Sequence, residues 1–185
     1  DATGNNNDYG EPTFITSDVG CINDNSVVIT PNGLMFQSAK GIYLLDQGLN
    51  LSYIGAPVED FNNLTITSAV LNATANQVIF TSSSGIALVY DYYMKQWSPW
   101  TNHYAVDSVI YNNVFTYLNS SGQVLTQQSN IFTDNSSPVY LSFTTPNLSF
   151  AGLQGFQRVF RCFILGSYKG PHVLNVSVAY DYNDS

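Results

Sequence analysis

Short apolar runs separated by glycine-containing turns recur through the first two thirds of the chain, and they constrain its fold more than any other feature. Each run has four to six residues, is filled by β-branched and aromatic side chains, and is too short for a typical helix. Such runs joined by tight turns are typical of β-hairpins. Three copies share an aromatic residue five positions before a turn glycine: Phe36 and Gly41, Phe80 and Gly85, Tyr117 and Gly122.

The three copies lie roughly 40 residues apart, within clusters over residues 26–54, 68–100 and 107–127. A period of about 40 to 50 residues with about four strands per unit is the mark of a β-propeller blade. Three units are visible, and a closed propeller needs at least about four. Two alternatives follow: either further blades are missing from this chain, or the repeats pack as a partial array.

The pattern changes after residue 130. Longer strands are predicted over 138–146, 158–165 and 173–180, and the last of these alternates strictly between apolar and polar residues. The sequence therefore predicts an all-β chain with little helix, in three parts. These are a flexible entry over residues 1–17, blade-like β-meander repeats over 18–130, and a small β-sandwich-like sheet module over 131–185.

The chain carries few charges for its length. Charged residues make up 10% of it, against roughly 25% in an ordinary soluble domain. Its formal net charge is −8, and its polar surface must come from Asn, Ser, Thr, Gln and Tyr. The basic residues number only five: Lys40, Lys95, Arg158, Arg161 and Lys169. Tight binding to nucleic acid or to an anionic membrane needs clustered cations, so neither is predicted.

Motifs of known enzymes are missing from the sequence. There is no G-x-S-x-G, no P-loop, no H-E-x-x-H and no C-x-x-C. The two histidines, His103 and His172, stand in loop contexts, and a catalytic triad needs His beside a nucleophile and an acid. We therefore predict a chain that is not an enzyme, with no catalytic residue, no metal and no cofactor.

Two segments share a Tyr-Asp-Tyr core, centred on Asp91 and Asp181. A metal site or a carboxylate pair would need further acids converging on them, so the favoured interpretation is a solvated Asp that turns the chain at a strand end. A nearby aromatic cluster could stack on sugars, but core or interface packing is the favoured interpretation. Its members are Tyr90, Tyr92, Tyr93, Trp97 and Trp100.

Cys21 and Cys162 lie far apart in the sequence. The sequence alone leaves a disulfide between them open, and buried free thiols are the favoured interpretation because free Cys packs like a small hydrophobic residue.

Several segments together resemble a known family of viral proteins. They are Asp18–Cys21, Gly33–Leu45, Tyr53–Glu59, Ala87–Tyr92 with Gln96–Ser98, Leu153–Val159, Gly166–His172 and Val178–Tyr182. The ensemble is similar to the tail hub or nozzle protein, also called the packaged-DNA stabilisation protein, of short-tailed bacteriophages. No single motif carries the resemblance, which touches nearly the whole chain from Asp18 to Tyr182.

The resemblance implies a virion structural protein of the phage tail, made in the host bacterial cytoplasm. In that family the chain forms a ring, typically a hexamer, below the portal and its adaptor and above the distal tail proteins. The ring continues the DNA channel and helps to retain the packaged genome, with only weak, passive contact with DNA. Members are much longer, so the resemblance implies that this chain is an interior or C-terminal portion.

Four residues are candidates for an interface between subunits: Trp97, Trp100, Arg158 and Arg161. Arg158 and Arg161 are the only arginines, and their spacing of three would place them on opposite faces of a strand. Two other functions stay open. One is a carbohydrate-binding all-β module that uses Tyr and Trp as stacking surfaces, and the other is a propeller enzyme such as a glycosidase.

Overall fold

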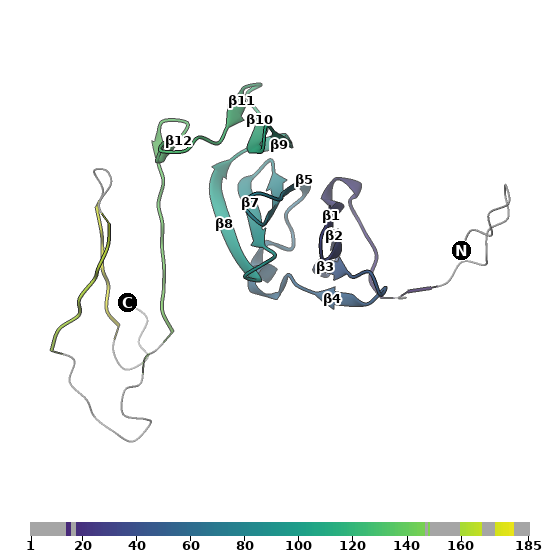
Figure 1. Cartoon of the computed structure of the whole chain (residues 1–185), viewed down its shortest axis with the longest axis horizontal. Helices are drawn as coiled ribbons and strands as arrows, with labels where there is room; N and C mark the ends of the chain where they lie inside the picture. The colour runs from purple at the N-terminus through teal and green to yellow at the C-terminus, as the bar shows by residue number, and fades with distance from the viewer. Residues whose placement is uncertain (1–13, 16–17, 147, 149–159, 168–172, 180–185) are drawn as a thin grey trace, which may run out of the picture. The chain divides into compact units, whose positions relative to one another are not determined.

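The structure is a computed structural model that describes residues 14–15, 18–146, 148, 160–167 and 173–179. The chain divides into two compact units, Asp1–Val139 and Tyr140–Ser185. The first unit holds the strands drawn as arrows in Figure 1.

The first sheet is a four-stranded antiparallel meander in which each strand pairs with the next. Its strands are β1 (Val28–Thr30), β2 (Gly33–Ser38), β3 (Gly41–Leu45) and β4 (Leu51–Tyr53). The short 3-10 helix η1 (Asp24–Ser26) precedes it, and a second one, η2 (Ala56–Phe61), follows it. These two are the only helices among the described residues.

The second sheet repeats the same meander, and the third repeats its first three strands. The second consists of β5 (Ile66–Asn72), β6 (Gln77–Ser82), β7 (Gly85–Asp91) and β8 (Gln96–His103). The third consists of β9 (Ala105–Tyr111), β10 (Val114–Asn119) and β11 (Val124–Thr126). A separate hairpin joins β12 (Thr133–Asp134) to β13 (Ser137–Pro138). The all-β prediction is confirmed.

The turn glycines stand where the sequence places them. Gly41, Gly85 and Gly122 have φ angles of +115°, +91° and +82°, a backbone region that other residues rarely adopt. Each follows the strand that carries the repeated aromatic residue. The repeat therefore marks equivalent hairpins in three successive sheets.

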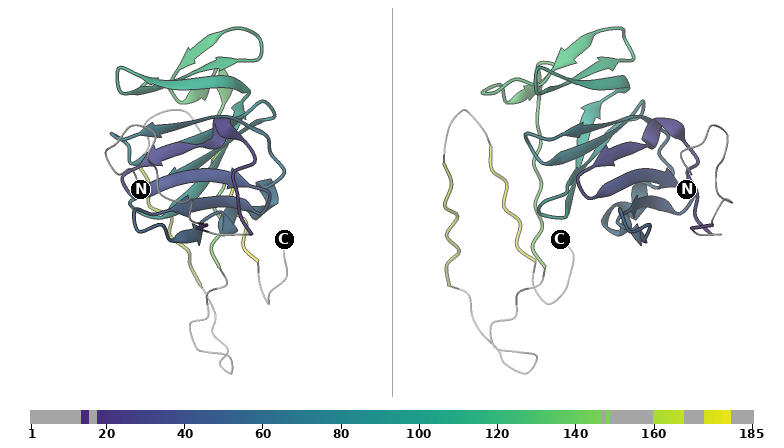
Figure 2. Two further views of the ribbon diagram at one scale, coloured as in Figure 1. Left: turned by 90° about the vertical axis from the view of Figure 1, so that its right-hand side faces the viewer. Right: turned by 45° about the vertical axis from the view of Figure 1, so that its right-hand side comes forward.

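Side chains of β6 and β7 alternate between two cores because successive residues of a strand point to opposite faces. Val78, Phe80 and Leu88 lie fully or almost fully buried in a core shared with the first sheet. Ile79 and Val89 lie in a second core, which they share with the third sheet. The second sheet therefore lies between the other two, as Figure 2 shows.

The first core is completed by Val28, Met35 and Ile42 of the first sheet and by Val58 of η2. The second is completed by Ala105, Phe115 and Tyr117 of the third sheet. In both contacts, one face of a sheet thus packs against a face of the next sheet along the chain.

The first strands of the three sheets lie on one side of the stack. The strand β1 contacts β5, and β5 contacts β9, whereas no comparable contact joins β4 to β8 or β8 to β11. Hydroxyl groups join β5 to the third sheet: Thr67 Oγ1 donates to the Ala105 carbonyl at 2.8 Å, and Ser108 Oγ donates to Ser68 Oγ at 2.9 Å. Successive sheets therefore fan out from a common side (Figure 1). The described sheets do not close into a ring.

The second unit differs from its sequence expectation in the residues that are described. No strand is assigned in 139–146, 160–167 or 173–179, where three strands are predicted. Large apolar side chains such as Leu141, Phe143 and Phe160 are exposed there, so the apolar pattern has no buried face to pack against. The β-sandwich-like module stays a prediction. The predicted flexible entry lies outside the described residues apart from Phe14 and Ile15.

Candidate functional site

The two tryptophans proposed for an interface lie on opposite faces of β8. The Trp97 ring packs against the core shared with the first sheet, 4.7 Å from the ring of Tyr90 between centroids. Its Nε1 donates to the carbonyl of Ile54 at 2.7 Å. The Trp100 ring packs against the core shared with the third sheet, 6.4 Å from the ring of Phe115. Within the chain, each tryptophan thus joins β8 to a different neighbour.

The two arginines of the candidate interface lie near the end of the chain. Arg161 is described and exposed, and Arg158 lies outside the described residues. Their role between subunits stays a prediction. Cys21 and Cys162 are free thiols and both are exposed, so the expectation of buried thiols is wrong. The Cys21 Sγ instead donates to the backbone carbonyl of Asn23 at 3.1 Å.

The aromatic cluster of the sequence analysis does not form a single platform. Tyr90 is buried, Trp97 and Trp100 face apart, and Tyr93 is exposed on the turn after β7. A sugar-stacking surface would need several of these rings on one open face. The favoured interpretation, core and sheet-to-sheet packing, matches the positions of Tyr90, Trp97 and Trp100.

The first Tyr-Asp-Tyr segment turns the chain, as predicted. Asp91 Oδ1 accepts hydrogen bonds from the backbone N–H groups of Tyr93, at 2.9 Å, and Met94, at 2.7 Å. This side-chain cap holds the turn between β7 and β8. Asp181 and His172 lie outside the described residues. His103 is the last residue of β8, so its predicted loop context is wrong, and its ring lies 5.3 Å from the Tyr117 ring between centroids.

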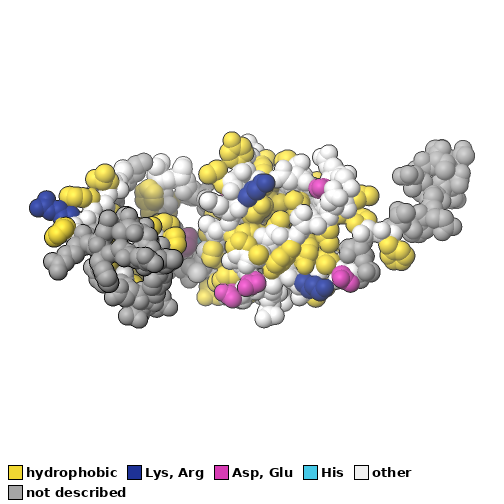
Figure 3. Space-filling view, turned by 90° about the horizontal axis from the view of Figure 1, so that it is seen from below, with side chains coloured by type: hydrophobic (Ala, Val, Ile, Leu, Met, Phe, Trp, Pro, Cys, Tyr) yellow, Lys and Arg dark blue, Asp and Glu magenta, His cyan; other side chains and the backbone are white. Residues whose placement is uncertain are grey.

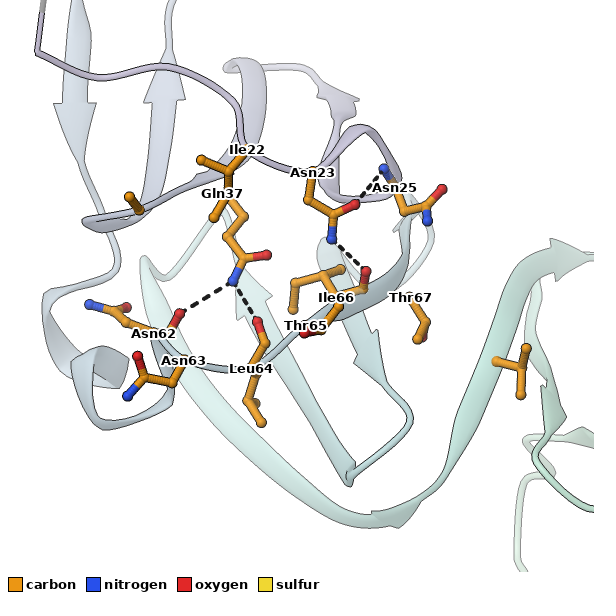
Figure 4. A pocket seen from close by; sticks show the side chains of 12 residues that line it. Ile22, Asn23, Asn25, Gln37, Asn62, Asn63, Leu64, Thr65, Ile66 and Thr67 are labelled. Carbon is orange, nitrogen blue, oxygen red and sulfur yellow. Dashed lines mark hydrogen bonds between the residues drawn. The ribbon is translucent and has the colours of Figure 1, made fainter.

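A cavity of about 510 Å³ opens beside η1, the end of β2 and the segment that leads into β5 (Figure 4). Its polar lining consists of neutral amides and hydroxyls, and no charged or aromatic side chain lines it. Gln37 lies at its back, 4% exposed, and its Nε2 donates to the carbonyls of Leu64, at 2.6 Å, and Asn62, at 3.4 Å.

Asn23 makes the matching link on the other side of the cavity. Its Nδ2 donates to the Ile66 carbonyl at 2.6 Å, and its Oδ1 accepts from the Asn25 backbone N–H at 3.1 Å (Figure 4). Together, Gln37 and Asn23 tie η1 and β2 to the segment over residues 62–66, which connects the first sheet to the second. The amides of the cavity thus join the first sheet to the segment that leads into the second.

Sequence reasoning missed both amides. The available signal was Gln37 itself, a polar residue inside the apolar run 34–38, at a position that the alternation turns toward the second sheet. A buried amide must find partners, but the sequence does not say which backbone carbonyls supply them. Every buried side-chain nitrogen or oxygen atom in the described part of the chain has a hydrogen-bond partner.

Two tyrosines in the cores have perturbed ionisation. Burial raises the pKa of the Tyr90 hydroxyl above its ordinary value of 10.0, and the neighbouring Asp91 carboxylate raises it further. Burial likewise raises the pKa of Tyr117, with a further contribution from Asp134. Both hydroxyls are therefore neutral at physiological pH.

Among the described residues, no three His, Cys, Asp or Glu side chains lie together in a way that could hold a metal ion. Nor does that part of the chain contain a helix long and apolar enough to cross a membrane. In the space-filling view of Figure 3, hydrophobic side chains cover much of the central part, and the few charged side chains stand around them.

The fold and these contacts define a class: an all-β protein of stacked antiparallel meanders joined by apolar cores and neutral hydrogen bonds. Comparison of the chain with protein-family models, with curated proteins and with solved structures gives no match.

Proposed function

We propose that this chain is a structural part of a phage tail hub or nozzle, a ring that continues the DNA channel and helps to retain the packaged genome. The observation that carries the proposal is the fan of three meanders, with β1, β5 and β9 on one side. Sheets that turn about a common side are suited to building a curved wall. The sequence resemblance to the tail hub family points to the same role.

The proposed partners follow from this role. They are further copies of the chain in a ring, which is a hexamer in the family that it resembles, a portal adaptor on one side and distal tail proteins on the other. The proposal includes no catalysis, no cofactor and no membrane binding. The proposed localisation is the virion tail, after synthesis in the host bacterial cytoplasm.

The charge of the chain is in keeping with only weak contact with DNA. Five basic residues and a net charge of −8 leave few groups that could neutralise phosphates. A wall with strong phosphate contacts would slow DNA during ejection, whereas a neutral-polar, mildly acidic wall lets it pass. We expect the chain to follow the second pattern.

Immunogold labelling of short-tailed virions that encode this chain tests the location. Gold at the tail, below the capsid vertex, is the expected result, and gold confined to the capsid shell or missing from intact and opened virions would contradict the proposal.

Fluorescence anisotropy with duplex DNA at low salt tests the passive wall. We expect no DNA binding at protein concentrations below the micromolar range, and a sub-micromolar Kd would contradict this part of the proposal. The variant Glu59→Lys/Asp60→Lys reverses two exposed charges on η2, and each reversal adds +2, so the net charge changes from −8 to −4. This variant should bind DNA more tightly and shows that the assay can detect binding.

A carbohydrate-binding module is the second candidate. It needs a concave aromatic surface, whereas the described tryptophans face apart and the amide-lined cavity contains no aromatic side chain. A glycan array separates the two functions, because a tail hub wall should bind no glycan selectively. An assay for hydrolysis of glycosides tests the third function, a glycosidase. A tail hub wall should hydrolyse none of them.

A further inference from the structure

The third sheet has one strand fewer than the two sheets whose plan it repeats. In the first sheet β3 pairs with the fourth strand, β4, and in the second sheet β7 pairs with the fourth strand, β8. In the third sheet β11 pairs with β10 on one side and with no described strand on the other. The next strand along the chain, β12, pairs with β13 instead. No described strand of the same chain therefore fills the fourth position beside β11.

The free edge of β11 offers backbone groups to a further strand. The carbonyl of Gln123 and the N–H of Gln127 both form hydrogen bonds of 2.9 Å with β10. Because the direction of the backbone groups alternates along an antiparallel strand, Val124 and Thr126 direct theirs toward the free edge. Val124 is 68% exposed, and Thr126 is exposed as well. An uncovered edge of this kind is a template for pairing with another chain.

Residues 139–144, which directly follow β13, have the pattern of a strand but belong to none. Large apolar side chains at the odd positions alternate with tyrosine or hydroxyl-bearing side chains at the even ones, as in a strand with one buried face. The segment is extended (Figure 1) and is assigned to no strand. Its odd-numbered side chains are exposed: Val139 by 55%, Leu141 by 94% and Phe143 by 85%. We call residues 139–144 the donor segment.

The donor segment has the features of an edge strand. Pro138 and Pro146 flank it, and proline is tolerated at strand ends and in edge strands because it has no N–H to pair. The fourth strand of the second sheet, β8, is also an edge strand and contains Pro99. A fourth strand of the third sheet would hold the same edge position, so the flanking prolines suit it.

The side chains of the donor segment also match the two faces of β11. One face carries Leu125, which packs against the core that the second and third sheets share. The other carries Thr126, whose hydroxyl lies 3.2 Å from the hydroxyl of Thr116. An antiparallel donor segment, paired as β8 is with β7, places its apolar row on the face of Leu125 and Ser142 beside Thr126. This pairing puts apolar side chains beside a core and a hydroxyl beside hydroxyls.

We infer that the donor segment of one copy of this chain pairs with the free edge of β11 in a neighbouring copy and forms the fourth strand of its third sheet. In a single copy neither the donor segment nor this edge has a strand partner among the described residues, so each finds its partner in another copy. When an extended segment adds to a sheet edge, main-chain hydrogen bonds give affinity and alternate side chains give specificity.

The donor segment and the β11 edge are different parts of the chain, so this contact runs head to tail. Each copy gives a strand to one neighbour and receives a strand from another. Head-to-tail contacts build a ring when the rotation between copies closes. The contact is therefore compatible with the ring of the proposed function, but the inference rests on strand pairing and not on a role in the tail.

Disulfide trapping between two single-cysteine forms of the full chain tests the inference. Both forms carry Cys21→Ser and Cys162→Ser, which remove the exposed native thiols. The donor form carries Ser142→Cys, and the acceptor form carries Thr126→Cys. The control acceptor is Val109→Cys, because Val109 is 54% exposed on the same face of the third sheet but lies on β9, at the opposite edge.

Two further forms fix the register and the face. Val124→Cys is a second acceptor, which Ser142→Cys would reach if the pairing were shifted by two residues. Leu141→Cys is the control donor, because neighbouring side chains of a strand point to opposite faces. The substituted side chains are exposed, so circular dichroism should show an unchanged fold in all forms.

Donor and acceptor forms are mixed at micromolar concentrations with oxidised glutathione, and mass spectrometry identifies the linked peptides. Ser142→Cys should link to Thr126→Cys or to Val124→Cys at least about tenfold faster than to Val109→Cys, because paired strands hold the two thiols at a high effective concentration. Leu141→Cys should link more slowly than Ser142→Cys.

Three outcomes would each overturn the inference. The first is linkage to both β11 acceptors at no more than the rate of the control acceptor. The second is linkage that is as fast from Leu141→Cys as from Ser142→Cys. The third concerns a chain that carries Ser142→Cys and Thr126→Cys together: if the disulfide forms within single chains and leaves monomers, the donor segment pairs with its own β11.

Discussion

Trp97 and Trp100, three residues apart on β8, face different neighbours: Trp97 packs toward the first sheet and Trp100 toward the third. The odd spacing produces this result because strand side chains alternate. One strand thus contributes its largest side chains to both of the contacts that hold the stack together. The Trp97 indole adds a directional bond, through Nε1, to the carbonyl of Ile54.

The substitution Trp97→Phe keeps most of the ring packing but removes this hydrogen bond. The Ile54 carbonyl then loses its donor, so the free energy of unfolding should fall by about 1–3 kcal/mol. Trp100→Phe is the matched control, since no hydrogen bond of the Trp100 indole is seen within the described residues. Urea unfolding measures both, and equal losses in the two variants would count against a specific role for the indole N–H.

Gly85 and Gly122 allow a matched test of the turns. Both have positive φ angles, so alanine at either position should cost about 1 kcal/mol in backbone strain. At Gly85, a Cβ atom would also lie 2.7 Å from Cε1 of Tyr104, whereas at Gly122 no atom lies within 4 Å. Gly85→Ala should therefore destabilise the chain by roughly 1–3 kcal/mol more than Gly122→Ala. Thermal unfolding of the two variants checks the order, which a larger loss at Gly122 would contradict.

Gln37→Ala should weaken the connection between the first two sheets. It leaves the Leu64 and Asn62 carbonyls without the amide that now donates to them, so a loss of about 1–3 kcal/mol is expected. Gln96→Ala is the control, since Gln96 is an exposed strand residue and its loss should change stability by less than about 0.5 kcal/mol. Hydrogen exchange should show faster exchange in β2 and residues 62–66 for the first variant alone. Equal protection of β2 and residues 62–66 in the two variants would contradict the proposed link between the sheets.

Alkaline pH should destabilise the fold through Tyr90 and Tyr117. Their pKa values are raised above 10.0 in the folded chain, so the unfolded chain loses these protons first. The stabilisation is therefore fully present below about pH 10 and is lost as the pH rises through the folded pKa values. Denaturant unfolding between about pH 8 and pH 11 measures this fall.

The variants Tyr90→Phe and Tyr117→Phe should each make that alkaline fall shallower. Tyr93→Phe, at an exposed position, serves as the control. A fall of unchanged steepness in both core variants would exclude these hydroxyls as its cause.

The meanders themselves could be predicted from the sequence because their determinants are local. Alternation set the faces of β6 and β7, and the glycines at 41, 85 and 122 marked turns that need a positive φ angle. Trp97 and Trp100 lie on opposite faces of β8 because successive side chains of a strand alternate, and this follows from their spacing alone. The residues that each ring contacts do not follow from the spacing.

The remaining features depend on partners that are distant in sequence. Gln37 finds carbonyls 25 and 27 residues away, and nothing near it specifies them. The thiol of Cys21 is exposed because its segment precedes the first sheet instead of entering a core. At 173–179 the alternation is as regular as in any strand, yet a strand also needs a neighbour to pair with.

The hydroxyl contacts between β5 and the third sheet have a consequence for the conditions that the stack tolerates. Thr67, Ser68 and Ser108 are neutral at physiological pH, and their bonds involve no ion pair. Counterions therefore have no charge to screen in these bonds, and the one carboxylate beside them, Asp107, accepts from the Ser108 backbone N–H at 2.7 Å and not from these hydroxyls. The hydroxyl bonds between these two sheets should therefore be insensitive to ionic strength.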